Sequence, residues 1–137
     1  MANRIILLYS IDELKKKLTR FSYSEGGFFG GYKSIDLVKD DMQIKSVYCH
    51  SLKEGKEYSI DKEKWDEFVN KMFELNIHKW KRKYNNNDIC DGSQWELKME
   101  FNDLPNFESF GSNEYPKNWE LFEDIIFEYF PEMQYTE

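Results

Sequence analysis

The chain has 137 residues, a formal net charge of −7 and an apolar fraction of 40%, rich in Phe, Tyr and Trp. A chain of this length forms one domain on ordinary size grounds and buries about two thirds of its unfolded surface, so it needs neither a metal nor a disulfide to fold. No apolar run reaches the roughly 18 residues that span a bilayer, and Ile5–Tyr9 is too short for a signal-peptide core. We expect one cytoplasmic domain over 1–137 with a frayed tail over 132–137.

The first half of the chain predicts a short helix followed by an antiparallel meander. The run Ile5–Tyr9 suits a buried strand or the entry to a helix, and its periodicity does not decide between them. Ser10 and Glu13 then form the two ends of a capping box, which predicts a helix over about 11–18. Alternating polar and apolar residues follow. Strands are expected from Thr19 toward the glycine pairs of Gly26–Gly31, over 34–38 and over 43–50, with a loop at 53–57.

The second half predicts two long helices on either side of a hairpin. Large apolar residues from Trp65 to Phe73 recur at helical spacing behind Asp61, so a helix is expected over about 62–75. Apolar and polar residues alternate from Trp95 to Phe101, which predicts a strand with one face exposed to water. The segment 107–110 is expected to form its partner strand. Asn118 is the expected cap of a last helix over 118–130, which Pro131 ends.

These elements together predict the α+β class. We expect an antiparallel sheet of about four to six strands, with the helices 62–75 and 118–130 packed on one face. The segment between those helices, from Trp80 to Pro116, has the highest density of motifs. It contains a basic and aromatic run, an Asp-Gly turn at Asp91, and the loop Gly111–Pro116, where Gly111 and Asn113 are residue types suited to a left-handed backbone.

Charge is distributed unevenly along the chain. Residues 1–84 carry 17 of the 19 basic and 13 of the 26 acidic side chains, whereas residues 85–137 carry 2 and 13, a formal −11. If these carboxylates share one face, they repel nucleic acid and attract a basic protein surface. The alternative is that they form the wet faces of one strand and one helix.

The chain also resembles two groups of known proteins. The pattern Trp80, Tyr84, Asp91-Gly92, Trp95, followed by Gly111-Ser112-Asn113 and Tyr115-Pro116, looks like one found in small uncharacterised bacterial and phage-associated proteins, and implies no known chemistry. The order of elements, from a glycine-and-ring strand at Glu25–Gly31 through the mid-chain helix and the hairpin to the closing helix, is similar to that of emfourin-like protease inhibitors. That second resemblance implies inhibition of a metalloprotease, but the basic run and the Gly-Ser-Asn loop depart from the family, so no inhibitory residue can be carried across.

The residue pattern does not favour catalysis or a cofactor. Cys49, His50, His78 and Cys90 lack the spacing of a zinc knuckle, so no metal is expected. A nucleophilic pair of Cys90 with His78 or His50, and a ligand site at Gly26–Gly31, stay open as the small-enzyme or ligand-binding alternative. In the run Lys79–Tyr84, basic side chains alternate with aromatic ones, as they do in surfaces on which nucleic-acid bases stack. The acidic stretch after this run argues against a nucleic-acid partner.

We therefore predict a non-catalytic acidic protein-binding module. It would inhibit or neutralise a partner protein with a basic surface, as immunity proteins and phage counter-defence inhibitors of the anti-CRISPR kind do. No enzyme activity, cofactor, membrane or nucleic-acid partner is expected. Trp and Tyr most often anchor such interfaces, and the candidate interface residues lie in the aromatic loops: Trp80, Tyr84, Asp91, Asn113, Glu114 and Tyr115.

Overall fold

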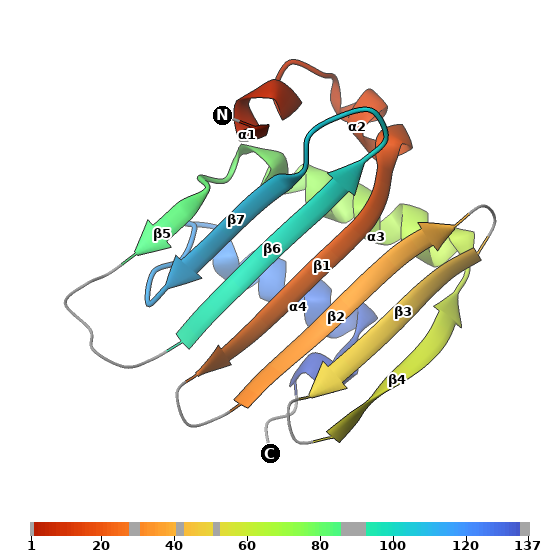
Figure 1. The fold of residues 1–137 in the computed structure, drawn as a ribbon, viewed down its shortest axis with the longest axis vertical. Helices are drawn as coiled ribbons and strands as arrows, with labels where there is room; N and C mark the ends of the chain where they lie inside the picture. The colour runs from red at the N-terminus through yellow and green to blue at the C-terminus, as the bar shows by residue number, and fades with distance from the viewer. Residues whose placement is uncertain (1, 28–30, 41–42, 51–52, 86–92, 135–137) are drawn as a thin grey trace.

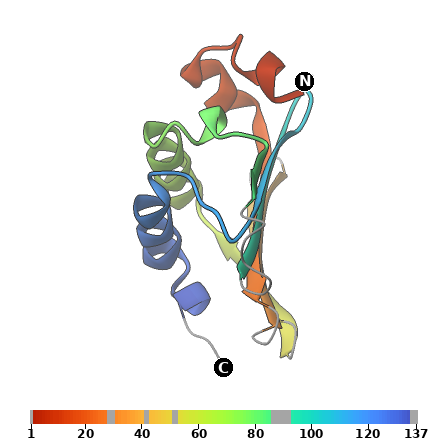
Figure 2. The same ribbon diagram turned by 90° about the vertical axis from the view of Figure 1, so that its left-hand side faces the viewer.

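A computed structural model describes residues 2–27, 31–40, 43–50, 53–85 and 93–134. The fold is α+β, as expected: two long helices, α3 (Lys62–Glu74) and α4 (Trp119–Tyr129), cover one face of a large open sheet (Figures 1 and 2). Two short helices, α1 (Ala2–Ile6) and α2 (Ile11–Lys17), lie at one end of the molecule. No described helix is long and apolar enough to cross a bilayer.

Within the described residues, seven strands make the sheet, in the order β4-β3-β2-β1-β6-β7-β5. Every neighbouring pair is antiparallel except β5 and β7, which run parallel. The central strand, β1, pairs with β2 on one side and with β6, far along the chain, on the other. The strands are β1 (Leu18–Gly27), β2 (Gly31–Asp40), β3 (Gln43–His50), β4 (Lys53–Ile60), β5 (Lys83–Asn85), β6 (Ser93–Phe101) and β7 (Phe107–Ser112).

The sheet is larger than the four to six strands expected, because two segments were not recognised as strands. The charged segment 53–57, expected as a loop, belongs to β4. As an edge strand β4 needs a partner on only one side, and charged residues are common at sheet edges. The short β5 lies within the basic run and is held by parallel pairing with a distant strand, which local sequence does not encode.

The N-terminal apolar run, which suited either a strand or a helix entry, forms α1 and the turn after it. Ser10 then closes the expected capping box with Glu13 and begins α2. Asp61 begins α3 by accepting a hydrogen bond from the Lys64 amide at 2.7 Å. Asn118 precedes α4 but makes no capping hydrogen bond with its side chain, contrary to expectation.

One continuous core lies between the sheet and the two long helices. Its sheet side comes from alternate residues of β1, β2, β6 and β7, and its helix side from the stripe of α3 and from α4. Residues Pro131–Gln134, which include the start of the tail expected to fray over 132–137, form a 3₁₀ turn, η2, in which Met133 is fully buried. Residues 135–137 lie outside the described part.

Candidate functional site

The rings of the Trp80–Pro116 segment gather on the helix side of the sheet. Trp80, Trp95, Trp119 and Phe122 form a tryptophan cluster in which the Trp95 and Trp119 rings lie 4.7 Å apart. Tyr84 borders the cluster through Trp95, and Tyr115 borders it through Trp119 at 4.9 Å. Three separate stretches of the chain are therefore joined by this one group of rings.

Internal acceptors bind two of the indole N–H groups of the cluster. Trp95 Nε1 donates to the Glu114 carbonyl at 3.0 Å, and Trp80 Nε1 donates to Asn118 Oδ1 at 3.0 Å. The Asn118 amide in turn donates to the Leu75 carbonyl at the end of α3, at 2.7 Å. The Asn118 side chain thus links α3 to the tryptophan cluster and leaves the start of α4 without a side-chain cap.

The loop that follows β7 is shaped by the same contacts. A Cβ at Gly111 would lie 2.2 Å from Trp95 Nε1, so the residue must be glycine for reasons of space. We expected Gly111 to adopt a left-handed backbone, but it does not. Asn113 does, with φ of 60°. The Gly-Ser-Asn motif is explained by packing at its first position and by backbone conformation at its third.

The basic run before β5 exposes its charges and turns its rings inward. Lys79, Lys81, Arg82 and Lys83 are exposed, whereas Trp80 is only 7% exposed and Tyr84 is half-buried. The Lys81 amide donates to the Tyr84 hydroxyl at 3.0 Å. Ser109 Oγ donates to the Lys81 carbonyl, and the Phe110 amide to that of Arg82. The aromatic rings of this run therefore do not form an exposed stacking platform.

The six predicted interface residues differ in how accessible they are. Burial removes Trp80 from the candidate surface, and Tyr84 and Asn113 are only partly accessible. Glu114 is exposed, although its Oε2 also accepts the Asn85 amide at 2.8 Å, and Tyr115 is 39% exposed. Asp91 lies outside the described residues, as do Gly92 and Cys90.

Tyr115 and Glu114 lead directly to the solvent face of α4. That face exposes Leu121, 56% of which is accessible, among acidic neighbours. We name as the α4 face the residues Glu114, Tyr115, Glu120, Leu121, Asp124 and Glu128. Sequence reasoning missed Leu121, although the predicted stripe of α4 placed it opposite the core: an apolar residue on the polar side of a helix was the available signal.

The α4 face has a negative field that neighbouring groups strengthen. Burial, together with Glu25, Asp124 and Glu120, raises the pKa of Glu123 on the same helix above its ordinary value. The adjoining surface of α3 exposes one lysine, Lys62, and four acids, Glu63, Asp66, Glu67 and Glu74. Glu128 bonds Lys71 of α3 at 2.9 Å, so one acid of the face is partly neutralised. The acidic last third is thus split, with one part on this helix layer and Glu96, Glu100 and Glu108 in the strands.

A second group of ionisable side chains is buried between the sheet and η2. Tyr23 donates its hydroxyl hydrogen to one oxygen of Glu25, and Lys33 Nζ lies 3.2 Å from the other. Lys33 also donates to the Met133 carbonyl. Burial, and then the Glu25 charge, raises the pKa of Tyr23 well above its usual value, which keeps the phenol protonated. These groups satisfy one another and hold η2 against the sheet.

Of the cysteine and histidine residues of the enzyme alternative, only His78 has a described side chain. His78 is buried, packs against Phe73 and has no hydrogen-bond partner at Nδ1. Cys49 and His50 are neighbours in β3, whose side chains are outside the described part. Gly26 and Gly31 belong to strands that pair as a hairpin, and β2 rather than a helix follows them. Within the described residues, no three metal-ligating side chains form a cluster.

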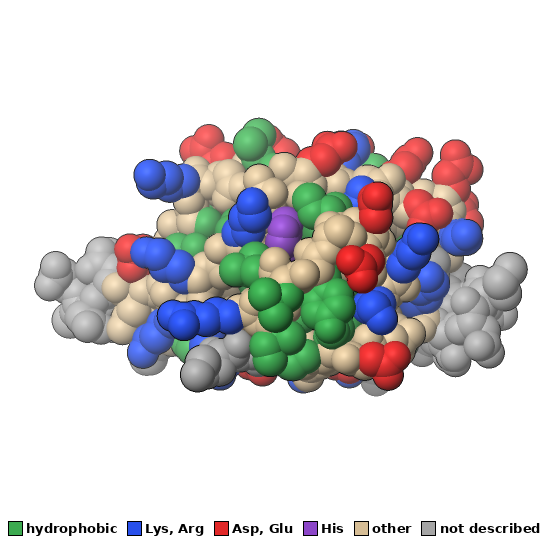
Figure 3. All heavy atoms as spheres, turned by 90° about the horizontal axis from the view of Figure 1, so that it is seen from above, with side chains coloured by type: hydrophobic (Ala, Val, Ile, Leu, Met, Phe, Trp, Pro, Cys, Tyr) green, Lys and Arg blue, Asp and Glu red, His purple; other side chains and the backbone are tan. Residues whose placement is uncertain are grey.

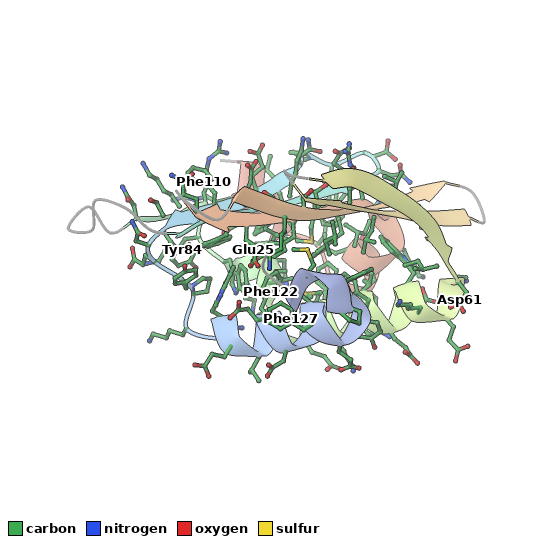
Figure 4. The ribbon with its side chains drawn as sticks, turned by 90° about the horizontal axis from the view of Figure 1, so that it is seen from below. Glu25, Asp61, Tyr84, Phe110, Phe122 and Phe127 are labelled. Atoms are coloured by element: carbon green, nitrogen blue, oxygen red, sulfur yellow. The ribbon has the colours of Figure 1, made fainter. Side chains whose placement is uncertain are left out.

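The uncovered face of the sheet holds an open hollow. Its volume is about 760 Å³, and its lining includes Lys83, Glu96, Glu108 and Phe110. Phe110 lies on the opposite side of the sheet from Tyr84, Glu25 and Phe122 (Figure 4). The lining mixes charges of both signs and also includes Tyr84 and Trp95, so the hollow borders the tryptophan cluster. No residue of the α4 face lines it.

No protein-family model matches the chain, and no curated protein is significantly similar to it.

Proposed function

We propose that the protein is a non-catalytic module that binds a basic protein partner through the α4 face and neutralises it, as immunity proteins and phage counter-defence inhibitors do. The observation that supports this most is Leu121. It is 56% exposed in the first turn of α4, a helix whose accessible residues Glu120, Asp124 and Glu128 are acidic. An apolar anchor with a charged rim is the usual anatomy of a protein-recognition surface.

Tyr115 adds a second anchor to the same surface. Its ring is 39% exposed and rests on Trp119 at 4.9 Å, so the tyrosine is held before any partner arrives. A side chain that is already ordered loses little conformational freedom on binding. The cluster below the α4 face thus contributes to recognition by positioning rings rather than by reacting with a ligand.

Electrostatics favour a basic partner. Acids outnumber basic side chains on α4 and α3, although Lys62, Lys64 and Lys71 also lie on α3, and a net negative field speeds association with a positive surface. Tyr23, Glu25 and Lys33 bond to one another and to the Met133 carbonyl. Because these polar groups are already used within the fold, they support a binding role for the protein over a catalytic one.

The test is capture of partners from the native cell lysate with the tagged chain. We expect one stoichiometric, basic protein whose retention falls as salt rises. The variant Glu120→Lys/Asp124→Lys, and separately Leu121→Ser, should abolish its capture, because these changes reverse the rim charge or remove the anchor. All three positions are exposed, so the fold should be unaffected.

The matched control reverses two acids on the other face of the molecule. Glu96→Lys/Glu108→Lys changes net charge equally but lies on the uncovered side of the sheet, and it should capture the partner as wild type does. If the α4 variants still capture the partner, or if the control loses it equally, the α4 face is not the binding surface. A metalloprotease as the captured partner would point to inhibition of the emfourin type.

A further inference from the structure

A second exposed patch lies at the N-terminal end of the molecule and does not involve the α4 face. Four apolar side chains of α1, α2 and the turn between them are accessible: Ile5 at 40%, Leu7 at 50%, Leu8 at 82% and Ile11 at 37%. We name these four residues the N-terminal tip. Figure 3 shows hydrophobic atoms gathered at this end of the molecule. A contiguous group of large exposed aliphatic residues usually marks a contact surface.

The tip is convex. In Figure 2 the connection between α1 and α2 forms the extreme end of the molecule, opposite the C-terminus. Leu8, the most exposed of the four, belongs to that connection. A protruding apolar turn enters a soft apolar medium readily, whereas another folded protein would need a matching cavity to receive it.

The backbone amides of the turn are already hydrogen-bonded. The amides of Leu7, Leu8 and Tyr9 donate to the carbonyls of Arg4, Ile5 and Ile6 at 3.2, 3.0 and 3.2 Å. Unsatisfied amides are costly wherever water is scarce, so such bonds are required of any turn that leaves water. Half-buried Tyr9 packs against the core and holds the turn in place.

Basic side chains surround the tip. Arg4 lies in α1 and Lys15, Lys16 and Lys17 in the last turn of α2, while η1 (Ile77–Lys79), which contacts α1, leads into Lys81 and Arg82. The described acids at this end are fewer: Asp12, Glu13, Glu74, Asp103 and Glu108, the last of which bonds Asn3 of α1 through its backbone. In a chain whose net charge is −7, this end is locally positive. Lysine and arginine beside exposed leucine are the composition of segments that bind anionic bilayers at their surface.

We propose that the N-terminal tip inserts into the interfacial region of an anionic lipid bilayer. Leu7 and Leu8 enter the boundary between headgroups and acyl chains, and the surrounding Lys and Arg side chains bind the lipid phosphates. The prediction of no membrane partner considered only spanning length, which a surface contact does not require. This proposal is independent of the α4 face, which lies on the helix layer and not at this end.

The experiment is flotation of the purified chain with vesicles. Phosphatidylcholine vesicles containing about 30% phosphatidylserine should bind the protein at low ionic strength, and pure phosphatidylcholine vesicles should bind it much less. Raising the salt from about 0.05 to about 0.5 M should release most of the bound protein. Leu8→Ser should weaken binding about tenfold, since the residue that inserts becomes polar.

Two variants separate the contributions of charge and of surface leucines in general. Lys15→Glu/Lys16→Glu should abolish the preference for phosphatidylserine. Leu121→Ser removes an exposed leucine elsewhere and should bind vesicles as wild type does. The proposal is overturned if phosphatidylserine vesicles do not retain the chain at low salt, or if Leu8→Ser and wild type bind equally. The proposal is also overturned if the chain does not bind vesicles and Leu8→Ser no longer captures the protein partner. The tip would then be a contact surface for that protein.

Discussion

Gly111 is the residue at which a single methyl group should cause the largest local conflict. Its added Cβ would lie 2.2 Å from Trp95 Nε1 and 2.6 Å from the Glu114 carbonyl oxygen, the two atoms that hydrogen-bond each other. We expect Gly111→Ala to lower the free energy of unfolding by about 3 kcal/mol, because the indole must move and its bond is lost. Urea denaturation, followed by tryptophan fluorescence, measures this.

The neighbouring position provides the control for that substitution. Ser112 faces the uncovered side of the sheet, where the hollow is open. Ser112→Ala should change stability by no more than about 0.5 kcal/mol. If Gly111→Ala costs no more than this control, the close approach of the loop to Trp95 is not what requires glycine there.

At the scale of elements, Lys33 joins the C-terminal turn to the sheet. Lys33→Met should lower the free energy of unfolding by about 3 kcal/mol, because it removes one partner of a buried ion pair and leaves Glu25 bonded to Tyr23 alone. The loss should be local first. Hydrogen exchange should show faster exchange of the amides of η2 and the end of α4 than of those in β6.

An exposed ion pair supplies the comparison. Lys98 lies 3.7 Å from Glu100 on the other face of the sheet, and its side chain is 38% accessible. Lys98→Met should cost less than about 1 kcal/mol, since surface pairs contribute little. Equal losses from the two variants would show that burial of Lys33 is not what makes it important.

The elements that sequence predicted well are those whose signals are local. Trp65 to Phe73 and the Asp61 cap specify α3 within one stretch of chain, and Trp95 to Phe101 alternate in the same way. Lys33 is different. Its carbonyl acceptor, that of Met133, lies 100 residues away, and a lysine at an inward strand position is an exception to the polarity pattern that sequence reasoning relies on.

The candidate site was predictable only in part for a related reason. The residues near Trp80 combine aromatic and basic side chains, and this composition suits an interface or a packed cluster equally well. Exposure decides between these, and it depends on how three distant segments meet. Tyr115 and Glu114 remain on the surface, whereas Trp80 faces the core.

For the whole molecule, His78 should make stability depend on pH. Burial, aided by Lys79, lowers the pKa of His78 below its ordinary 6.5, so the folded state keeps the imidazole neutral. The unfolded chain takes up the proton at the ordinary value. This part of the stability is therefore complete above pH 6.5 and falls below it, by at most about 1.4 kcal/mol per pH unit, until the folded group also titrates.

Substitution isolates this contribution. His78→Phe keeps a ring against Phe73 but cannot bind a proton. The difference in free energy of unfolding between wild type and variant, measured from pH 7.5 to 5.5, should shift in favour of the variant as the pH falls. The raised pKa of Glu123 makes the folded state more stable as the pH falls, the opposite of the effect of His78. Glu123 is present in both proteins, so its contribution cancels in the difference. A difference that does not vary with pH would exclude His78 as the cause.

The position of β1 makes the two halves of the chain complementary fragments. One edge of β1 bonds β2, from the first half, and the other edge bonds β6, from the second. The helix of each half, α3 or α4, covers the same sheet. Neither half alone can pair both edges of β1 or complete the core. A chain divided between β5 and β6 would therefore regain its fold only by reassociation of both pieces, which makes that connection a natural site for a split reporter.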